Sequence, residues 1–121
     1  MPEYQRMTIR EMLRNPGGLE SKLIEVDGVS LGATLDAHGI FFYAWLRDDR
    51  EDSKLLAVTG NETQEKNAWV VSLLNAASMR LTLVTVRGTL TRDRNLGANA
   101  LLFHQIEYAN QVITGSHYPK S

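Results

Sequence analysis

Five segments typical of β-strands and one helix follow each other in an order that constrains what this chain can fold into. The helix is expected over residues 62–78, where apolar residues recur at the spacing of one helical face. The strand-like segments are rich in apolar and β-branched residues and are bounded by turn formers. They cover residues 19–35, 40–47 and 54–60 before the helix, and residues 80–92 and 101–113 after it. A mainly β domain is therefore expected, with its helix between the third and fourth strands.

Two of these segments are long and are interrupted by glycine. Gly28 and Gly32 lie within residues 19–35, and Gly88 lies within residues 80–92. Glycine inside a strand pattern indicates a bulge or a sharp bend. Curvature of this kind is what five strands need in order to close into a small barrel.

The segments "KLIEVDGVSLG" (22–32) and "VTVRGTLTR" (84–92) resemble the opening strand and the bent fourth strand of OB-fold modules, particularly those of the anticodon-binding and single-strand-binding type. The resemblance covers residues 19–113 and implies a five-stranded Greek-key barrel. Residues 1–18 would form an N-terminal helical extension and residues 114–121 a tail, with the whole chain as one domain. Two alternatives stay open: an SH3-like barrel with an inserted helix, and an α+β sandwich.

Both expected helices carry recognisable start signals. A short helix over residues 8–14 would begin with a capping box formed by Thr8 and Glu11. The long helix would begin at Asn61, with Gln64 at the capping-box position. Its residues Trp69, Leu73 and Leu74 are expected to plug one end of the barrel.

The stretch "GIFFYAWLR" (39–47) places large apolar side chains on both faces of one expected strand. One of the two faces carries Phe41, Tyr43, Trp45 and Arg47. The resemblance implies that the outer face of this strand is the ligand platform. Aromatic rings stack on bases of any identity, worth roughly 1–3 kcal/mol per base, and Arg pairs with phosphate. These four residues are therefore predicted to bind single-stranded DNA or RNA.

Two other occupants of the same face remain open. The short N-terminal helix over residues 8–14 could cover the rings within the chain. A protein partner, or a second copy of the chain forming a homodimer, could also bind there, because aromatic and Arg side chains dominate protein interfaces. The formal net charge of −1 argues against a strongly basic nucleic-acid binder.

Charged residues cluster at two places. Arg80, Arg87, Arg92 and Arg94 form a basic cluster in the sequence. Arg92 and Arg94 lie in the loop that the resemblance places at the binding mouth. We take Arg87, Arg92 and Arg94 as candidate contacts, against the alternative of a solvated strand face. The acidic cluster consists of Asp48, Asp49, Glu51 and Asp52, directly after the aromatic strand, where it would repel phosphates.

No catalytic, cofactor or metal motif emerges from the chain. "GVSLG" (28–32) has the letters of a nucleophile elbow but lies in a strand pattern rather than at a strand-to-helix turn. Cysteine is absent, and His38, His104 and His117 are too far apart for a local metal-binding spacing. His104 is expected to be packed or hydrogen-bonded at the edge of the core. We therefore expect a binding module that is not an enzyme and uses no cofactor or metal.

The N-terminus lacks the apolar run of a signal peptide, and no window is apolar enough to cross a bilayer. These observations predict a cytoplasmic protein without a membrane partner.

Overall fold

The computed structural model describes residues 3–48 and 55–119. Short elements come first: β1 (Gln5–Arg6), α1 (Ile9–Arg14) and a 3₁₀ helix, η1 (Pro16–Leu19). The remaining elements are β2 (Leu23–Leu35), β3 (Phe42–Arg47), β4 (Leu55–Gly60), α2 (Gln64–Met79), β5 (Leu83–Asp93), β6 (Ala98–Tyr108) and β7 (Gln111–Thr114).

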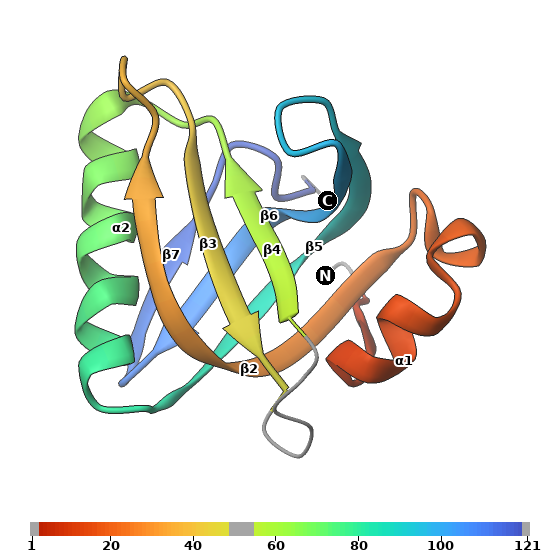
Figure 1. Cartoon of the computed structure of the whole chain (residues 1–121). Coiled ribbons are helices and arrows are strands. Elements are labelled where there is room, and N and C mark those ends of the chain that lie inside the picture. Colours follow the sequence, from red (N-terminus) through yellow and green to blue (C-terminus); the bar gives the residue numbers. More distant parts are fainter. Residues whose placement is uncertain (1–2, 49–54, 120–121) are drawn as a thin grey trace.

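Strands β2, β3, β4, β6 and β5 form a closed barrel (Figure 1). Each strand pairs with the next in that order, and β5 pairs back with β2. The β4–β6 pair is parallel and the other four pairs are antiparallel. With α2 between the third and fourth barrel strands, this is the topology of an OB-fold. The predicted fold class is confirmed.

The barrel closes through bends at two of the predicted positions. The β2–β3 register shifts between Ser30 and Gly32, and the β5–β6 register shifts between Arg87 and Gly88. A Cβ atom at position 88 would collide with the backbone carbonyl oxygen of Leu102. Only glycine therefore allows β5 and β6 to approach each other at this bulge.

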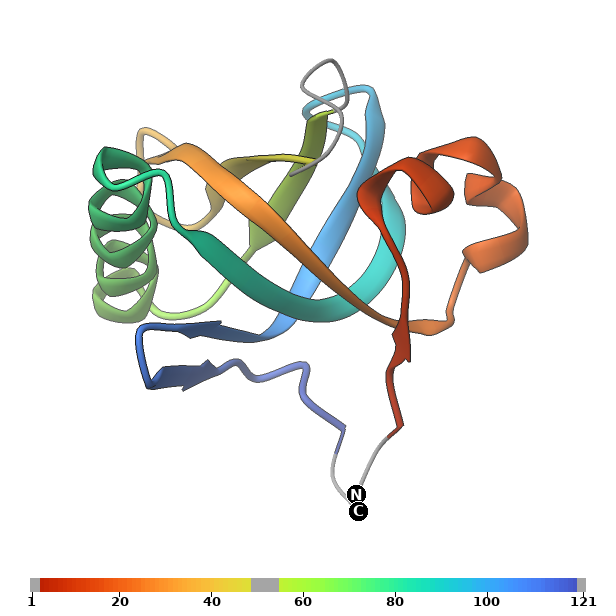
Figure 2. The same ribbon diagram turned by 90° about the horizontal axis from the view of Figure 1, so that it is seen from below.

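The two helices lie on opposite sides of the barrel (Figures 1 and 2). On α1, the predicted capping box of Thr8 and Glu11 is present, and Ile9 and Met12 are fully buried in the main core. On α2, the buried side chains are Asn67, Val70, Leu73, Leu74 and Ala77. Phe42 and Phe103 are among the largest fully buried side chains of the core, and their ring centroids lie 5.4 Å apart.

The expected last strand over residues 101–113 is in fact a hairpin. The chain turns at Ala109 and Asn110, both with positive φ, and returns as β7, which pairs antiparallel with β6. Positive φ is unusual for alanine, so the apolar pattern of this segment does not reveal the turn.

Two expectations about α2 are wrong. The N-cap is Thr63, whose side chain accepts a hydrogen bond from the backbone N–H of Lys66, and not Asn61. Trp69 does not plug the barrel, since half of its surface (50%) is exposed. Leu73 and Leu74 are buried as expected.

The C-terminal tail is hydrogen-bonded to the barrel and is not frayed in its described part. Ser116 donates from its backbone N and its Oγ to the carboxylate of Glu62, both at 2.9 Å. The ring of Tyr118 lies 6.2 Å from the ring of Tyr4, so the two described ends of the chain meet. Within the described ranges, no helix is long and apolar enough to cross a membrane.

Replacing Gly88 by alanine tests the dependence of closure on this bulge. We expect Gly88→Ala to lower the free energy of unfolding by about 1–3 kcal/mol, because the added methyl group meets backbone that cannot move aside. Urea denaturation measures this loss. The control is Gly17→Ala, where nothing lies within 4 Å of the added Cβ, and where stability should stay equal or rise slightly. Equal effects at both positions would contradict the role of the bulge.

Candidate functional site

A groove of about 420 Å³ lies on the outer side of the barrel, between the end of β4 and the loop that joins β5 to β6. The register explains why these parts meet, because Thr59 on β4 pairs with Tyr43 on β3 and with Leu102 on β6. The residues that line the groove are Phe41, Thr59, Gly60, Asn61, Thr91, Arg92, Asp93, Arg94, Asn95 and Leu102.

The β5–β6 loop has a fixed shape set by its own turn chemistry. Asp93 Oδ1 accepts hydrogen bonds from the backbone N–H groups of Asn95, at 2.8 Å, and Leu96, at 3.0 Å. Gly97 adopts a φ of +63° and donates its N–H to the backbone oxygen of Asp93. Asp and Gly are the residues that such turns favour. The loop therefore forms a stable wall of the groove.

A hydrogen bond joins this loop to the outer face of β3. Asn95 Nδ2 donates to the hydroxyl oxygen of Tyr43 at 3.0 Å. Phe41 lies two residues before Tyr43 and lines the groove. The turn-forming residues Asp93, Asn95 and Gly97 are typical of a loop, but no local signal predicts that Asn95 reaches β3.

The four residues predicted as an aromatic platform lie on the side of β3 that is opposite the core. They alternate with Phe42, Ala44 and Leu46, which are fully buried. The four residues are Phe41, Tyr43, Trp45 and Arg47, and all of them are half-buried. They are thus neither fully buried nor fully exposed.

Trp45 has small cross-strand neighbours on this face. Its register partners are Gly32 on β2 and Ala57 on β4. Neither neighbour has a side chain larger than a methyl group. The indole therefore has no bulky cross-strand neighbour.

The four arginines of the sequence cluster separate in the structure. Arg92 and Arg94 line the groove, but Arg92 belongs to β5 and not, as was expected, to the loop. Within the described ranges, neither of them forms an ion pair. Arg92 Nη2 donates a hydrogen bond to the backbone oxygen of Gly97 at 3.1 Å. Arg80 is the C-cap of α2, away from the groove. Arg87 lies four residues before Thr91 on β5, about 13 Å along the strand.

Arg87 belongs to an ion-pair network on a different wall of the barrel. Its Nε donates to Glu25 at 2.7 Å and its Nη1 to Glu107 at 2.5 Å. Glu25 also pairs with Arg6, at 2.5 Å, and Arg6 pairs in turn with Asp27. The network links β1, β2, β5 and β6. The structure therefore brings Arg92 and Arg94 to the groove but not Arg87.

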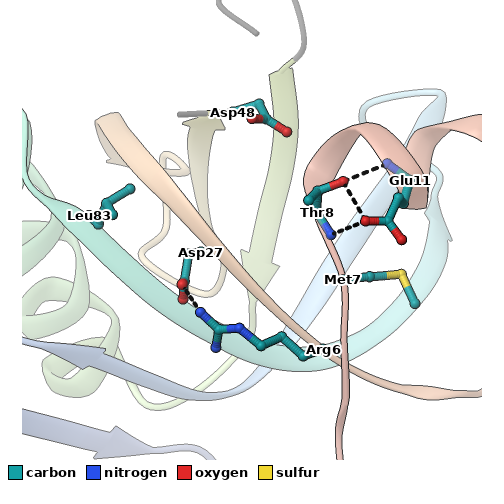
Figure 3. Close-up of a pocket in the computed structure, with 7 residues that line it drawn as sticks. All are labelled: Arg6, Met7, Thr8, Glu11, Asp27, Asp48 and Leu83. Carbon is teal, nitrogen blue, oxygen red and sulfur yellow. Dashed lines mark hydrogen bonds and ion pairs between the residues drawn. The ribbon is translucent and has the colours of Figure 1, made fainter. Parts of the chain in front are cut away.

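A second hollow, of about 290 Å³, lies between the N-terminal segment and the barrel (Figure 3). It is lined by Arg6, Met7, Thr8, Glu11, Asp27, Asp48 and Leu83. Figure 3 shows that the capping box and the Arg6–Asp27 pair engage most of its polar groups with one another. We therefore assign this hollow a structural role.

Only the first residue of the acidic cluster lies in the described part of the chain. Asp48 is buried, at 5% exposure, and its Oδ2 accepts a hydrogen bond from the backbone N–H of Arg10 at 3.2 Å. It therefore stabilises the first turn of α1 and is not a solvated loop charge. Asp49, Glu51 and Asp52 lie outside the described residues.

His104 is a buried structural residue, as expected. The hydroxyl of Tyr4 lies 2.9 Å from His104 Nδ1, and Thr89 Oγ1 lies 3.4 Å from Nε2. The ring of His117 stacks against the ring of His104, with the two ring centroids 6.4 Å apart. Burial, and secondarily the nearby His117, lowers the pKa of His104 below its ordinary value. Burial also raises the pKa of Tyr4 to about 12. Among residues 3–48 and 55–119, no three His, Asp or Glu side chains gather as a metal site requires.

The lowered pKa of His104 predicts a loss of stability in acid. The unfolded chain takes up a proton near the ordinary pKa of 6.5, whereas the folded chain resists it. The free energy of unfolding is therefore unaffected by this group above that pH, and falls as the pH drops below it toward the lowered folded-state value.

Thermal unfolding measured between about pH 7.5 and 5 tests this effect. The wild-type curve should fall more steeply than that of His104→Gln, which has no group to protonate at this position. His38→Gln, in an exposed turn, should keep the wild-type slope. A His104→Gln variant with the wild-type slope would show that another group controls the acid response.

No protein-family model matches the chain, and no curated protein matches it in sequence. Its structure is nevertheless similar to parts of solved proteins. A protein described as an aspartyl-tRNA synthetase from Leishmania major Friedlin superposes with a TM-score of 0.58 and 12% identity, covering 99% of this chain and 22% of that chain.

Two further structures give the same result. RecG bound to a three-way DNA junction matches with a TM-score of 0.58 and 11% identity, over 94% of this chain and 13% of that chain. Asparaginyl-tRNA synthetase from Pyrococcus horikoshii matches with a TM-score of 0.55 and 14% identity, over 93% of this chain and 24% of that chain. This chain thus spans about a quarter or less of the length of these proteins. Together with the strand order, the similarity defines it as an OB-fold domain.

Proposed function

We propose that the groove between β3, β4 and the β5–β6 loop binds single-stranded nucleic acid, and that the domain is a binding module rather than an enzyme. The observation that carries this proposal is the position of Arg92 and Arg94. Arg92, near the end of β5, and Arg94, in the loop that follows, line the groove without an ion-pair partner in the described ranges. The loop is tied to the aromatic strand through Asn95 and Tyr43.

The chemistry of the groove and of the adjoining face of β3 suits an unpaired strand better than a duplex. Phe41 in the groove and Trp45 further along the same face offer ring surfaces on which separate bases can stack, worth roughly 1–3 kcal/mol for each base. Arg92 and Arg94 offer guanidinium groups that bind phosphate oxygens in pairs. Bases must be free of their complementary strand to lie on the rings, so a single strand is the ligand class that uses both features.

The similar structures support this proposal at the level of the fold. Two of them are described as tRNA synthetases, and the third was solved with a DNA junction. Nucleic acids are therefore the ligands or substrates that their descriptions name. The aromatic and arginine positions are features of this chain and rest on its own geometry.

A protein segment is the second candidate occupant of the same face. The net charge of −1 is unfavourable for a polyanion. Tyr, Trp and Arg are also the residues that contribute most at protein interfaces. The experiments below distinguish this candidate, because a protein ligand would leave the response to oligonucleotides flat.

Tryptophan fluorescence tests the aromatic contact, since the chain has only Trp45 and Trp69. In Trp69→Phe, where Trp45 is the remaining reporter, a single-stranded oligonucleotide should quench the emission. In Trp45→Phe, where Trp69 is the reporter, the emission should not change. Trp45→Ala should weaken binding by about tenfold or more, the equivalent of one lost stacked base. No binding at micromolar concentrations in about 50 mM salt, where charge attraction is strong, would refute the proposal.

The dependence of affinity on salt tests the arginines. For a single strand, each phosphate contact contributes about −0.7 to the slope of log K against log salt concentration. Arg92→Gln and Arg94→Gln should each make the slope shallower by about this amount. Arg87→Gln is the matched control and should leave the slope unchanged. The reason is that Arg87 already pairs with Glu25 and Glu107. If Arg87→Gln makes the slope shallower than Arg92→Gln and Arg94→Gln do, the ligand binds on the wall of the barrel that carries Arg87.

A further inference from the structure

The outer face of α2 exposes two large apolar side chains. Trp69 is 50% exposed and Met79 is 86% exposed. A large exposed apolar surface of this kind commonly marks an interaction site. Between Lys66 and Arg80 the helix carries no charged residue at all, so this face lacks the usual solvated charges of a surface helix.

Five of the exposed residues of α2 form one continuous stripe, and Gln64, Ala68 and Asn75 are exposed as well. The stripe consists of Glu65, Trp69, Ser72, Ala76 and Met79, separated by four, three, four and three residues, and each is exposed. This alternation of four and three is the spacing by which one helix packs along another. The stripe is large at Trp69 and Met79 and small at Ser72 and Ala76, so a second helix can approach closely at its centre.

A shallow groove of about 230 Å³ runs beside the stripe. It is lined by Trp69, Ser72, Leu73, Ala76, Tyr108 and Gln111. Figure 1 shows that α2 lies on the flank of the barrel opposite α1, with its outer side facing away from the sheet.

We propose that a second copy of the chain docks on this face, with α2 against α2 in antiparallel orientation. The two-fold axis would lie between Ser72 and Leu73. Each residue on one side of the axis then faces the residue that lies equally far along the helix on the other side, in the second copy. Trp69 of one copy then meets Ala76 of the second copy, which pairs a large side chain with a small one. Glu65 of one copy meets Arg80 of the second copy, which pairs opposite charges.

Charge complementarity favours a second copy over an unrelated protein. Glu65 is the first residue of the stripe, and Arg80 directly follows Met79, its last residue. Both are exposed, and neither forms an ion pair within the described ranges. A two-fold axis satisfies both charges twice. A parallel pairing would instead oppose Glu65 to Glu65 and Trp69 to Trp69, with like charges in contact.

The stripe and the nucleic-acid groove do not share residues. Dimerisation is therefore independent of the proposed function, and either can fail without the other. One helix face with a neighbouring hairpin is smaller than a standard interface. The dimer is accordingly a weak, concentration-dependent one.

Sedimentation velocity on the full chain, from about 1 to 500 µM, covers the range expected of such a small interface. The wild type should change from monomer to dimer across this range. Glu65→Arg and Arg80→Glu should each raise the dissociation constant of the dimer by about tenfold or more, since each creates two like-charge contacts. Trp69→Ala should abolish the dimer.

The double variant Glu65→Arg/Arg80→Glu separates a specific contact from a general loss of stability. It restores both charge pairs in reversed order, and its dissociation constant should return to within about threefold of the wild-type value. Circular dichroism establishes that each variant folds. Arg14→Glu, an exposed charge reversal on α1, should leave the dimer unchanged.

Three outcomes would overturn the proposal. A wild type that stays monomeric at about 500 µM would leave a different protein as the occupant of this face. A dimer that survives Trp69→Ala would use another surface. A double variant as weak as the single variants would mean that Glu65 and Arg80 do not meet.

Discussion

Closure of the sheet between β2 and β5 is the constraint on which the other features depend. It requires β5 to bend at Gly88, because a side chain there would collide with the carbonyl oxygen of Leu102. Closure also brings the far end of β5 and its loop next to β4 and the outer face of β3. The groove is thus a direct product of the curvature, and its position follows from the pairing of Thr59 with Tyr43 and Leu102.

The arginines on the outer surface of the barrel fall into two groups, one ion-paired and one without an ion pair in the described ranges. On the β1–β2–β5–β6 wall, Arg6 and Arg87 are neutralised by Glu25, Asp27 and Glu107, and their role is to connect strands. At the groove, the loop uses Asp93 to satisfy its own backbone, and Arg92 and Arg94 form no ion pair in the described ranges. Residues of the same type, within one strand and the loop that follows it, thereby differ in what they can bind.

The sequence predicted the fold well because its signals are local. The order of strands and helix, the bends at Gly32 and Gly88 and the Thr8 capping box can all be recognised from short segments. The errors have non-local causes. The turn at Ala109 depends on a backbone conformation that alanine rarely adopts, and the exposure of Trp69 depends on how α2 rotates against the barrel. Likewise, the aromatic face could be predicted from alternation, whereas the neutralisation of Arg87 and the contact between Asn95 and Tyr43 depend on the barrel being closed.

The contact between Tyr4 and Tyr118 has a consequence for how such a domain can be built into larger proteins. Because the two described ends of the chain leave the barrel at one spot, with ring centroids 6.2 Å apart, the entire unit can be spliced into a surface loop of a host protein without forcing the flanking segments apart. The same proximity allows the ends to be ligated through a short linker and new ends to be opened elsewhere, which yields a circular permutant. The cluster of tyrosine and histidine rings at that spot would then pack beside the new linker.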